Sequence, residues 1–332
     1  MDTHISIIHT TKILDNNNNN IIIIIIILNT MNIYVINMDK DIQRLKKIQQ
    51  SAEKYDINFT RVSGVVINNE IIKTSPYISD FMKQYGTKGI IGSFLAHKKV
   101  WEIIVNDKID YAVILEDDIE FTPQFKSTLE QIKEDINGLD FDILLLSSLV
   151  GCKNPKNYNF VDMICRKFMR NTKYQYINDM YHIPEFFAGV QSYVVTYESA
   201  KKLLTELSVV NYYVDLALTY STNIKKIALN KPIIKLSDED CEISNNATSP
   251  YLLDKILKKI NIYNINLSWI LNISICQIPV PLNKTPIVIS PRFILKYLFI
   301  IFLTILLVYY NIVKEVQYWF IIILLYLIII IL

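Results

Sequence analysis

Three consecutive carboxylates, Glu116, Asp117 and Asp118, directly follow an apolar run at residues 111–115 (YAVIL). Such a run is typical of a fully buried strand, and open α/β sheets bind their ligands where strands end. Because alternate residues of an extended segment face the same way, Glu116 and Asp118 should point together. Their oxygens suit a hard divalent cation, Mn²⁺ or Mg²⁺, which would also offset the cost of clustering carboxylates. We therefore predict a metal site at Glu116 and Asp118, with a solvated turn as the alternative.

A second polar segment lies at an earlier strand-to-helix turn, where Asn37 and Asp39 are followed by Arg44. Helix N-termini bind phosphate groups through free backbone N–H groups and the helix dipole. Arg44 falls in the first turns of the helix, and its guanidinium can bind a phosphate with two donors. The alternative is an ordinary capped turn, in which Arg44 pairs with Asp41 or is solvated.

Two later segments carry further candidate residues. Gly92 opens a predicted helix that also carries His97, one of only four histidines in the chain. A lone histidine on a helix is more often structural than catalytic. Gly189 precedes a predicted strand, where a glycine allows close approach of a ligand to the backbone, and Asp215 follows later in the chain.

The elements that must position these residues alternate between strands and helices. Apolar patterning predicts strands at residues 32–37, 111–115, 141–146 and 191–196. It predicts helices at residues 41–55, 92–105 and 198–207, and a further helix that starts at Thr122-Pro123. This alternation favours an α/β domain with a largely parallel sheet.

Taken together and in order, four segments resemble the glycosyltransferase family 25 domain, which includes lipooligosaccharide and collagen hydroxylysine galactosyltransferases. They are NIYVINMDKDIQR, KGIIGSFLAHKKVWEII, YAVILEDDIEF, and GVQSYVVTYESAKKLL followed by YYVD. The similarity covers residues 31–250. The chain departs from the family pattern before His97, where Ser93 and Ala96 replace a cysteine and a serine.

The resemblance implies a GT-A-like (Rossmann-like) nucleotide-sugar-binding domain and a metal-dependent, inverting hexosyltransferase. The donor would be a UDP-sugar carrying galactose or glucose, and the acceptor a hydroxyl of a glycan, a lipid-linked glycan or a protein. An inverting transfer needs one carboxylate base, for which Asp215 is the candidate and Asp238 and Asp240 are the alternatives. The residues expected at the donor are Asn37, Asp39, Arg44, Gly92, His97, Asp117 and Gly189.

Two other functions compete with this interpretation. The first is a non-catalytic, membrane-tethered binding or scaffold protein that retains the fold. The second is a nucleotidyltransferase or phosphatase that uses the acidic triplet, although the sequence has no P-loop. The net charge of +2 and the absence of a long basic run argue against nucleic acid as a partner. The four cysteines form no CxxC pair, which argues against a zinc site.

Composition divides the 332 residues into four parts. Residues 1–30 form a low-complexity extension, 31–250 the domain that resembles glycosyltransferase family 25, 251–292 an amphipathic and proline-containing linker, and 293–332 an apolar tail. The tail holds uncharged stretches at 297–313 and 316–332, which predict a transmembrane segment of one or two helices. Lys284, Arg292 and Lys296 precede these stretches, so we expect the catalytic domain on the cytoplasmic face of a membrane.

Overall fold

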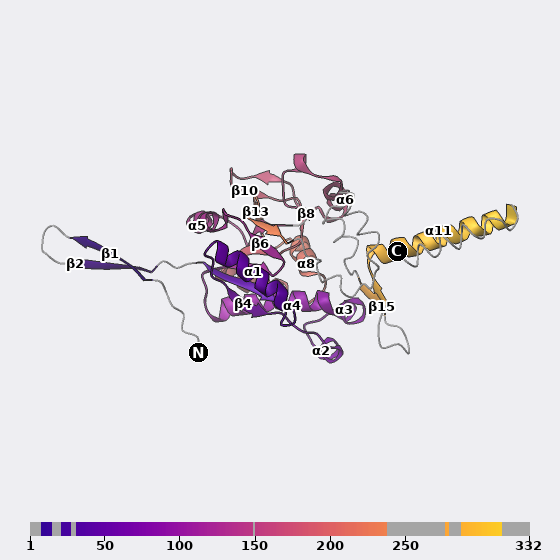
Figure 1. Cartoon of the computed structure of the whole chain (residues 1–332), viewed down its shortest axis with the longest axis horizontal. Coiled ribbons are helices and arrows are strands. Elements are labelled where there is room, and N and C mark those ends of the chain that lie inside the picture. Colours follow the sequence, from indigo (N-terminus) through magenta and orange to yellow (C-terminus); the bar gives the residue numbers. More distant parts are fainter. Residues whose placement is uncertain are drawn as a thin grey trace.

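The computed structural model describes residues 8–14, 21–27, 31–148, 150–237, 276–278 and 287–313. Its central feature is an eight-stranded sheet in the order β4-β3-β5-β12-β7-β13-β10-β9, with helices on both faces (Figure 1). The sheet strands are β3 (Asn32–Asn37), β4 (Thr60–Ser63), β5 (Tyr111–Glu116), β7 (Ile143–Ser147), β9 (Gln175–Tyr176), β10 (Tyr181–Ile183), β12 (Ser192–Thr196) and β13 (Lys226–Leu229).

The principal helices are α1 (Ile42–Lys54), α2 (Asn69–Thr74), α3 (Asp80–Tyr85), α4 (Lys88–Asn106), α5 (Phe125–Asp135), α6 (Phe160–Met169), α7 (Tyr197–Glu206), α8 (Val214–Tyr220) and α11 (Pro291–Val313). Short strands pair outside the main sheet: β6 (Ile119–Phe121) with β14 (Ile234–Leu236), β8 (Val150–Gly151) with β11 (Phe187–Ala188), and β15 (Cys276–Ile278) with β16 (Ile287–Ile289).

The sheet is mixed, whereas the alternation of elements predicted a largely parallel one. β3 runs parallel to β4 and β5, and β13 runs parallel to β7. β12 lies between β5 and β7 and is antiparallel to both. The chain leaves β7 at Ser147 and, after the excursion through β8 to β11, re-enters beside it at Ser192, so β12 must run in the opposite direction. The α/β class is confirmed.

Strand β5 is buried on both faces, as its continuous apolar run predicted. Ala112 and Ile114 belong to a core on one face, which also takes in the buried side of α4, α7 and α8. Val113 and Leu115 belong to a second core on the other face, with α1 and α5. Successive side chains of a strand point to opposite faces, so β5 packs against both cores. This packing fixes the position of Glu116 at the end of the strand.

Helix boundaries agree with the sequence pattern for α1 and differ for α4. The predicted helix at 41–55 encloses α1. α4 begins at Lys88, one turn before the predicted start at Gly92, because the Thr87 side chain accepts a hydrogen bond from the Ile90 N–H at 3.3 Å and caps the helix there. Gly92 therefore lies within the helix and does not open it.

The N-terminal extension contains a two-stranded hairpin. β1 (Ile8–Leu14) pairs antiparallel with β2 (Ile21–Ile27), the isoleucine run, in a register that joins Ile8 to Ile27. The hairpin lies apart from the eight-stranded sheet in Figure 1.

The prediction of a C-terminal transmembrane segment is wrong. Among the helices of the described residues, none is both long and apolar enough to cross a bilayer. The helix of the tail, α11, begins with Arg292 and Lys296 in its first turns. Its uncharged remainder, residues 297–313, rises only about 25 Å at 1.5 Å per residue, less than the hydrocarbon core of about 30 Å. The second apolar stretch, 316–332, lies outside the described residues.

Candidate functional site

A cavity of about 310 Å³ opens where β3 and β5 end, beside the first half of α4. Parallel strands end at the same edge of a sheet, so the turn after β3 and the acidic triplet after β5 meet there. The apolar wall consists of Ile36, Met38, Val65, Val66, Ile67 and Ala96. The polar wall consists of Lys40, Asp41, Arg44, Lys88, Ser93, His97, Glu116, Asp117 and Asp118, and the glycines are Gly64, Gly89 and Gly92.

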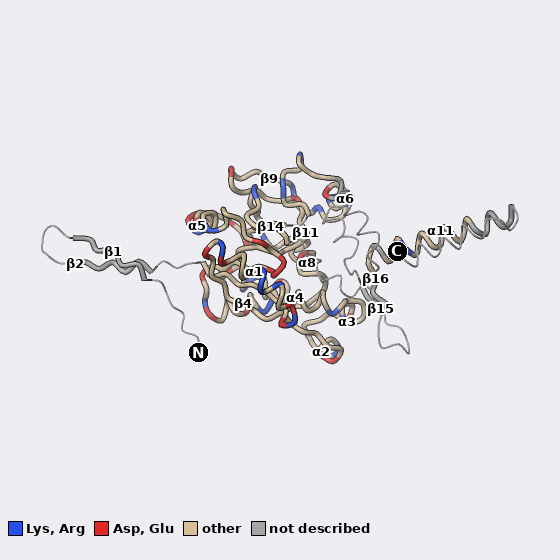
Figure 2. The backbone as a smooth tube through the Cα atoms, viewed as in Figure 1, with Lys and Arg blue, Asp and Glu red and all other residues tan. Residues whose placement is uncertain are grey.

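Basic and acidic residues both lie on and around α1 and α4 (Figure 2). Arg44 of α1 carries the main positive charge against the acidic triplet. Its Nη1 lies 2.9 Å from Oδ1 of Asp117, and its Nη2 lies 3.7 Å from Oδ2 of Asp118. The sequence suggested that Arg44 binds a phosphate or pairs with Asp41; the structure adds a role as counterion of the triplet. Arg44 still reaches the cavity wall, where a bound phosphate would add to its contacts.

Burial raises the pKa of both aspartates. Asp117 is held by Arg44 and by the Asn37 amide at 2.6 Å, and both interactions oppose the effect of burial. The pKa of Asp118 is raised to about 7, first by burial and then by the negative charge of Glu116, against the opposing pull of Arg44. A cation at this point would favour the charged form of Asp118, and cation binding would therefore release a proton near neutral pH.

Glu116 faces the cavity and is held from behind by His97. The Nε2 atom of His97 lies 3.1 Å from Oε1 of Glu116, and Nδ1 lies 2.9 Å from the Tyr193 hydroxyl. His97 is only 1% exposed although its edge lines the cavity. Both of its ring nitrogens are hydrogen-bonded to protein groups, Nδ1 to Tyr193 and Nε2 to Glu116.

The described residues offer no cluster of three or more His, Cys, Asp or Glu side chains that could hold a metal ion by themselves. Within the triplet, Asp117 has the closest contacts, with Asn37 at 2.6 Å and Arg44 at 2.9 Å, which leaves Glu116 and Asp118 as the candidates for a cation at the cavity wall. Mg²⁺ and similar ions are commonly held by one or two carboxylates together with substrate phosphates and water. The residues therefore fit a cation that a diphosphate helps to hold, and do not fit a cage made by protein alone.

Asn37 is buried and lies at the centre of the polar contacts behind the β3 turn. Its amide donates to Asp117, and its Oδ1 accepts from Nε of Arg61 at 2.8 Å. Arg61 also pairs with Asp39, an exposed residue that accepts a further hydrogen bond from Ser63 at 2.9 Å. These two partners lower the pKa of Asp39. Asp39 is not among the residues that line the cavity, so its contacts tie β3 to β4 and do not reach a ligand there.

Gly92 lets α4 approach the loop after β4. A Cβ at this position would lie 2.7 Å from the Val65 carbonyl oxygen, too close for either backbone to stay in place. Gly89, one turn earlier and also at the cavity, would place a Cβ with nothing within 4 Å. The two glycines thus form a matched pair on one helix.

We expect Gly92→Ala to lower the free energy of unfolding by about 1–3 kcal/mol, because the Val65 loop must move to relieve the contact. Gly89→Ala should raise it by up to about 1 kcal/mol, because alanine is the better helix former and meets no neighbour. Urea denaturation of both variants measures the difference. Equal shifts in the two variants would contradict a close approach at Gly92.

Gly189 and Asp215 are brought together, and neither is among the residues that line the cavity. Gly189 has φ +85°, a conformation that glycine adopts without strain, and its N–H donates to Oδ2 of Asp215 at 3.0 Å. Oδ1 of Asp215 accepts from the Leu216 N–H at 2.9 Å. Burial raises the pKa of Asp215, and the nearby negative charge of Glu116 adds to this, while both N–H groups oppose it.

Two of the predicted residues fall outside the described part of the chain, and three residues at or near the site were not predicted. Asp238 and Asp240 lie outside the described residues. Arg61, Lys88 and Tyr193 were not predicted as site residues. Lys88 could have been found from the sequence, because it is the first residue of the family-like segment KGIIGSFLAHKKVWEII. Arg61 and Tyr193 could not, because they reach the site only through the pairing of β4 with β3 and of β12 with β5.

Comparison with known proteins supplies the family. The family model described as Glycosyltransferase family 25 (LPS biosynthesis protein) matches residues 30–218, more than half of the chain. Inactive glycosyltransferase 25 family member 3 of Mus musculus is 29% identical over 125 residues, which are 34% of this chain and 21% of the relative. Procollagen galactosyltransferase 2 of Mus musculus is 26% identical over 119 residues, 33% of this chain and 19% of the relative.

A glycosyltransferase 25 family member of Anopheles gambiae is 26% identical over 189 residues, 54% of this chain and 29% of the relative. The chain thus spans less than a third of the length of each of these relatives. The match covers β3, α1, α4 and β5 and the segments between them, and so includes every residue that lines the cavity. The chain belongs to glycosyltransferase family 25.

Proposed function

We propose that the cavity binds a UDP-hexose and that the chain transfers the hexose, galactose or glucose, to a hydroxyl of a glycan or protein. The observation that carries the proposal is the position of Glu116 and Asp118, which lie at and just after the end of the doubly buried strand β5, at the wall of a 310 Å³ cavity. That volume lies in the range of small-molecule sites, and a family 25 relative is named a procollagen galactosyltransferase.

The two sides of the cavity suit the two parts of such a donor. Val65, Val66 and Ile67 offer an apolar surface for the flat face of a base. Lys88 lies in the first turn of α4, where its charge and the N–H groups of the helix N-terminus favour a phosphate. Mn²⁺ or Mg²⁺ bound at Glu116 and Asp118 would neutralise the departing diphosphate.

In the proposed transfer the bond between C1 of the hexose and the diphosphate oxygen breaks, and the acceptor oxygen forms a new bond to C1 from the opposite face. UDP leaves, and a carboxylate takes the acceptor's proton. Asp215 stays the candidate base from the family-like YYVD segment: it does not line the donor cavity, but its raised pKa favours proton uptake and each of its oxygens keeps a second lone pair beside its N–H partner. Asp238 and Asp240 stay alternatives.

A binding protein without turnover is the second candidate, because a mouse relative is named an inactive family member. Such a protein would keep the donor cavity and bind the nucleotide, yet release no free sugar or product. Donor binding and donor turnover must therefore be measured separately.

The test is a panel of nucleotide-sugars offered to the full chain with Mn²⁺ or with a chelator. We expect a UDP-hexose to raise the melting temperature and to be turned over, slowly by hydrolysis when no acceptor is present, only with the metal. NMR of a transfer product should show the inverted anomer. Binding without turnover across a wide acceptor panel favours the binding protein, and no binding of any nucleotide-sugar refutes both candidates.

A further inference from the structure

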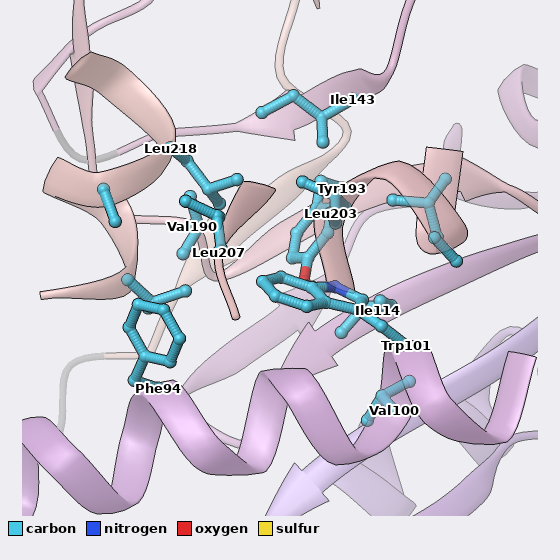
Figure 3. Packing of buried hydrophobic residues seen from close by; sticks show 14 of the residues in the cluster. Phe94, Val100, Trp101, Ile114, Ile143, Val190, Tyr193, Leu203, Leu207 and Leu218 are labelled. Carbon is cyan, nitrogen blue, oxygen red and sulfur yellow. The ribbon is translucent and has the colours of Figure 1, made fainter. Parts of the chain in front are cut away.

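A line of buried polar side chains runs through the apolar core from α4 and β12 to the cavity. The Trp101 indole N–H donates to the Tyr193 hydroxyl at 2.9 Å, and Figure 3 shows the two groups side by side among apolar residues. The same hydroxyl lies 2.9 Å from Nδ1 of His97, whose ring is stacked on that of Tyr193 with centroids 5.7 Å apart. Trp101 and Tyr193 are fully buried, and neither lines the cavity.

The direction of these hydrogen bonds follows from what each group can donate. An indole N–H only donates, so the Tyr193 oxygen accepts from Trp101. Burial raises the pKa of Tyr193, so its hydroxyl keeps its hydrogen, and that hydrogen has Nδ1 of His97 as its acceptor. Neutral His97 then carries its proton on Nε2, which points to Oε1 of Glu116 at 3.1 Å. Every hydrogen in the line has an acceptor in this arrangement.

A doubly protonated His97 would break the pattern. Nδ1–H and the Trp101 N–H would both point at the Tyr193 oxygen, and the buried hydroxyl hydrogen would lose its acceptor. Buried donors without acceptors are strongly disfavoured. The Trp101–Tyr193 pair therefore selects one tautomer of His97, the one that donates to Glu116.

We propose that Tyr193 and Trp101 are positioning residues, which hold His97 as the Nε2–H tautomer so that it fixes Oε1 of Glu116. Oε2 of Glu116, which has no hydrogen bond within the described residues, would then be available to a divalent cation shared with a nucleoside diphosphate. The cation rests on the proposed function, whereas the tautomer does not. Protein groups that orient a metal-binding carboxylate typically change metal affinity by about 10- to 100-fold when removed.

Tyr193→Phe tests the proposal, because it deletes the hydroxyl and keeps the ring that packs in the core. Tyr181→Phe is the matched control: Tyr181 is 1% exposed, and its hydroxyl donates to Oδ2 of Asp135 at 2.9 Å in the core on the other face of the sheet. If Tyr193→Phe does not fold, Trp101→Phe, which removes the donor to the hydroxyl together with part of the buried ring, takes its place.

The first readout is ¹⁵N NMR of the histidines in the metal-free full chain, with His97 assigned from a His97→Gln sample. We expect the Nε2–H tautomer in the wild type and in Tyr181→Phe, and a mixture of tautomers in Tyr193→Phe. The same tautomer in wild type and Tyr193→Phe, or a mixture in the wild type, would overturn the proposal.

The second readout is Mn²⁺ binding in the presence of UDP, followed by electron paramagnetic resonance. Tyr193→Phe should weaken Mn²⁺ binding by about 10- to 100-fold, and Tyr181→Phe should leave it unchanged. A changed tautomer with unchanged Mn²⁺ affinity would refute the link from His97 to Glu116. A wild type that binds no Mn²⁺ with UDP would instead refute the proposed function and with it the role of Glu116, while the tautomer result would stand.

Discussion

Asp118→Asn is expected to lower kcat/KM for a UDP-hexose by about a thousandfold, because a metal ion in such a site contributes several kcal/mol to charge stabilisation. The side chain keeps its shape and loses its charge. Since burial raises the pKa of this carboxyl from 3.8 to about 7, its contribution lowers the free energy of unfolding as the pH rises between these values, and the loss is complete above about 7. The variant should therefore be as stable as the wild type at pH 8, or more stable, and only its turnover should fail.

Asp140→Asn is the matched control, because Asp140 is an exposed carboxylate that pairs with Lys225 at 2.7 Å, apart from the cavity. It should keep wild-type kcat/KM. Mn²⁺ affinity of the wild type should also rise with pH through about 7, as Asp118 loses the proton that competes with the cation. Full metal-dependent turnover in Asp118→Asn would exclude this residue as a metal ligand.

Arg44→Met is expected to lower the free energy of unfolding by about 3–5 kcal/mol at pH 8, because it leaves two buried carboxylates without their counterion. Arg44 and Asp117 are 2.9 Å apart with side chains only 15% and 8% exposed. The loss should shrink as the pH falls and the aspartates take up protons. Urea denaturation at several pH values measures it.

Lys126→Met removes the positive partner of an exposed pair, in which Lys126 lies 2.8 Å from Asp56. Exposed pairs contribute about 0–1 kcal/mol, so this control should change stability little. The double variant Arg44→Met/Asp117→Asn should recover part of the lost stability, since one of the stranded charges is gone. A loss in Arg44→Met that is no greater than in Lys126→Met would contradict the assignment of Arg44 as counterion of the triplet.

The parts of the site that could be predicted from sequence are those made by local pattern. Apolar runs at residues 32–37 and 111–115 predicted two strands correctly, and the acidic triplet after the second run lines the cavity. After the first run the cavity is lined by Lys40 and Asp41, and not by the predicted Asn37 and Asp39. The order of these segments also led to the family. Both signals depend on residues close together in the chain, where strand periodicity and the end of an apolar run are readable.

The parts that could not be predicted depend on contacts between distant segments. Trp101 and Tyr193 are 92 residues apart, and Arg61 meets Asn37 across 24 residues through the register of two parallel strands. The reversal of β12 depends on where the chain re-enters the sheet, which hydropathy does not encode. The membrane prediction failed for a related reason: composition showed an apolar tail, but not the limits of the helix it would form.

UDP binding, measured by calorimetry on the full chain with Mn²⁺ and with a chelator, tests the assignment of the cavity most directly. If Glu116 and Asp118 hold a cation that bridges to the diphosphate, Mn²⁺ should tighten UDP binding by at least about tenfold, and Asp118→Asn should abolish that gain. Equal UDP affinity with and without Mn²⁺, or an undiminished gain in Asp118→Asn, would contradict the assignment.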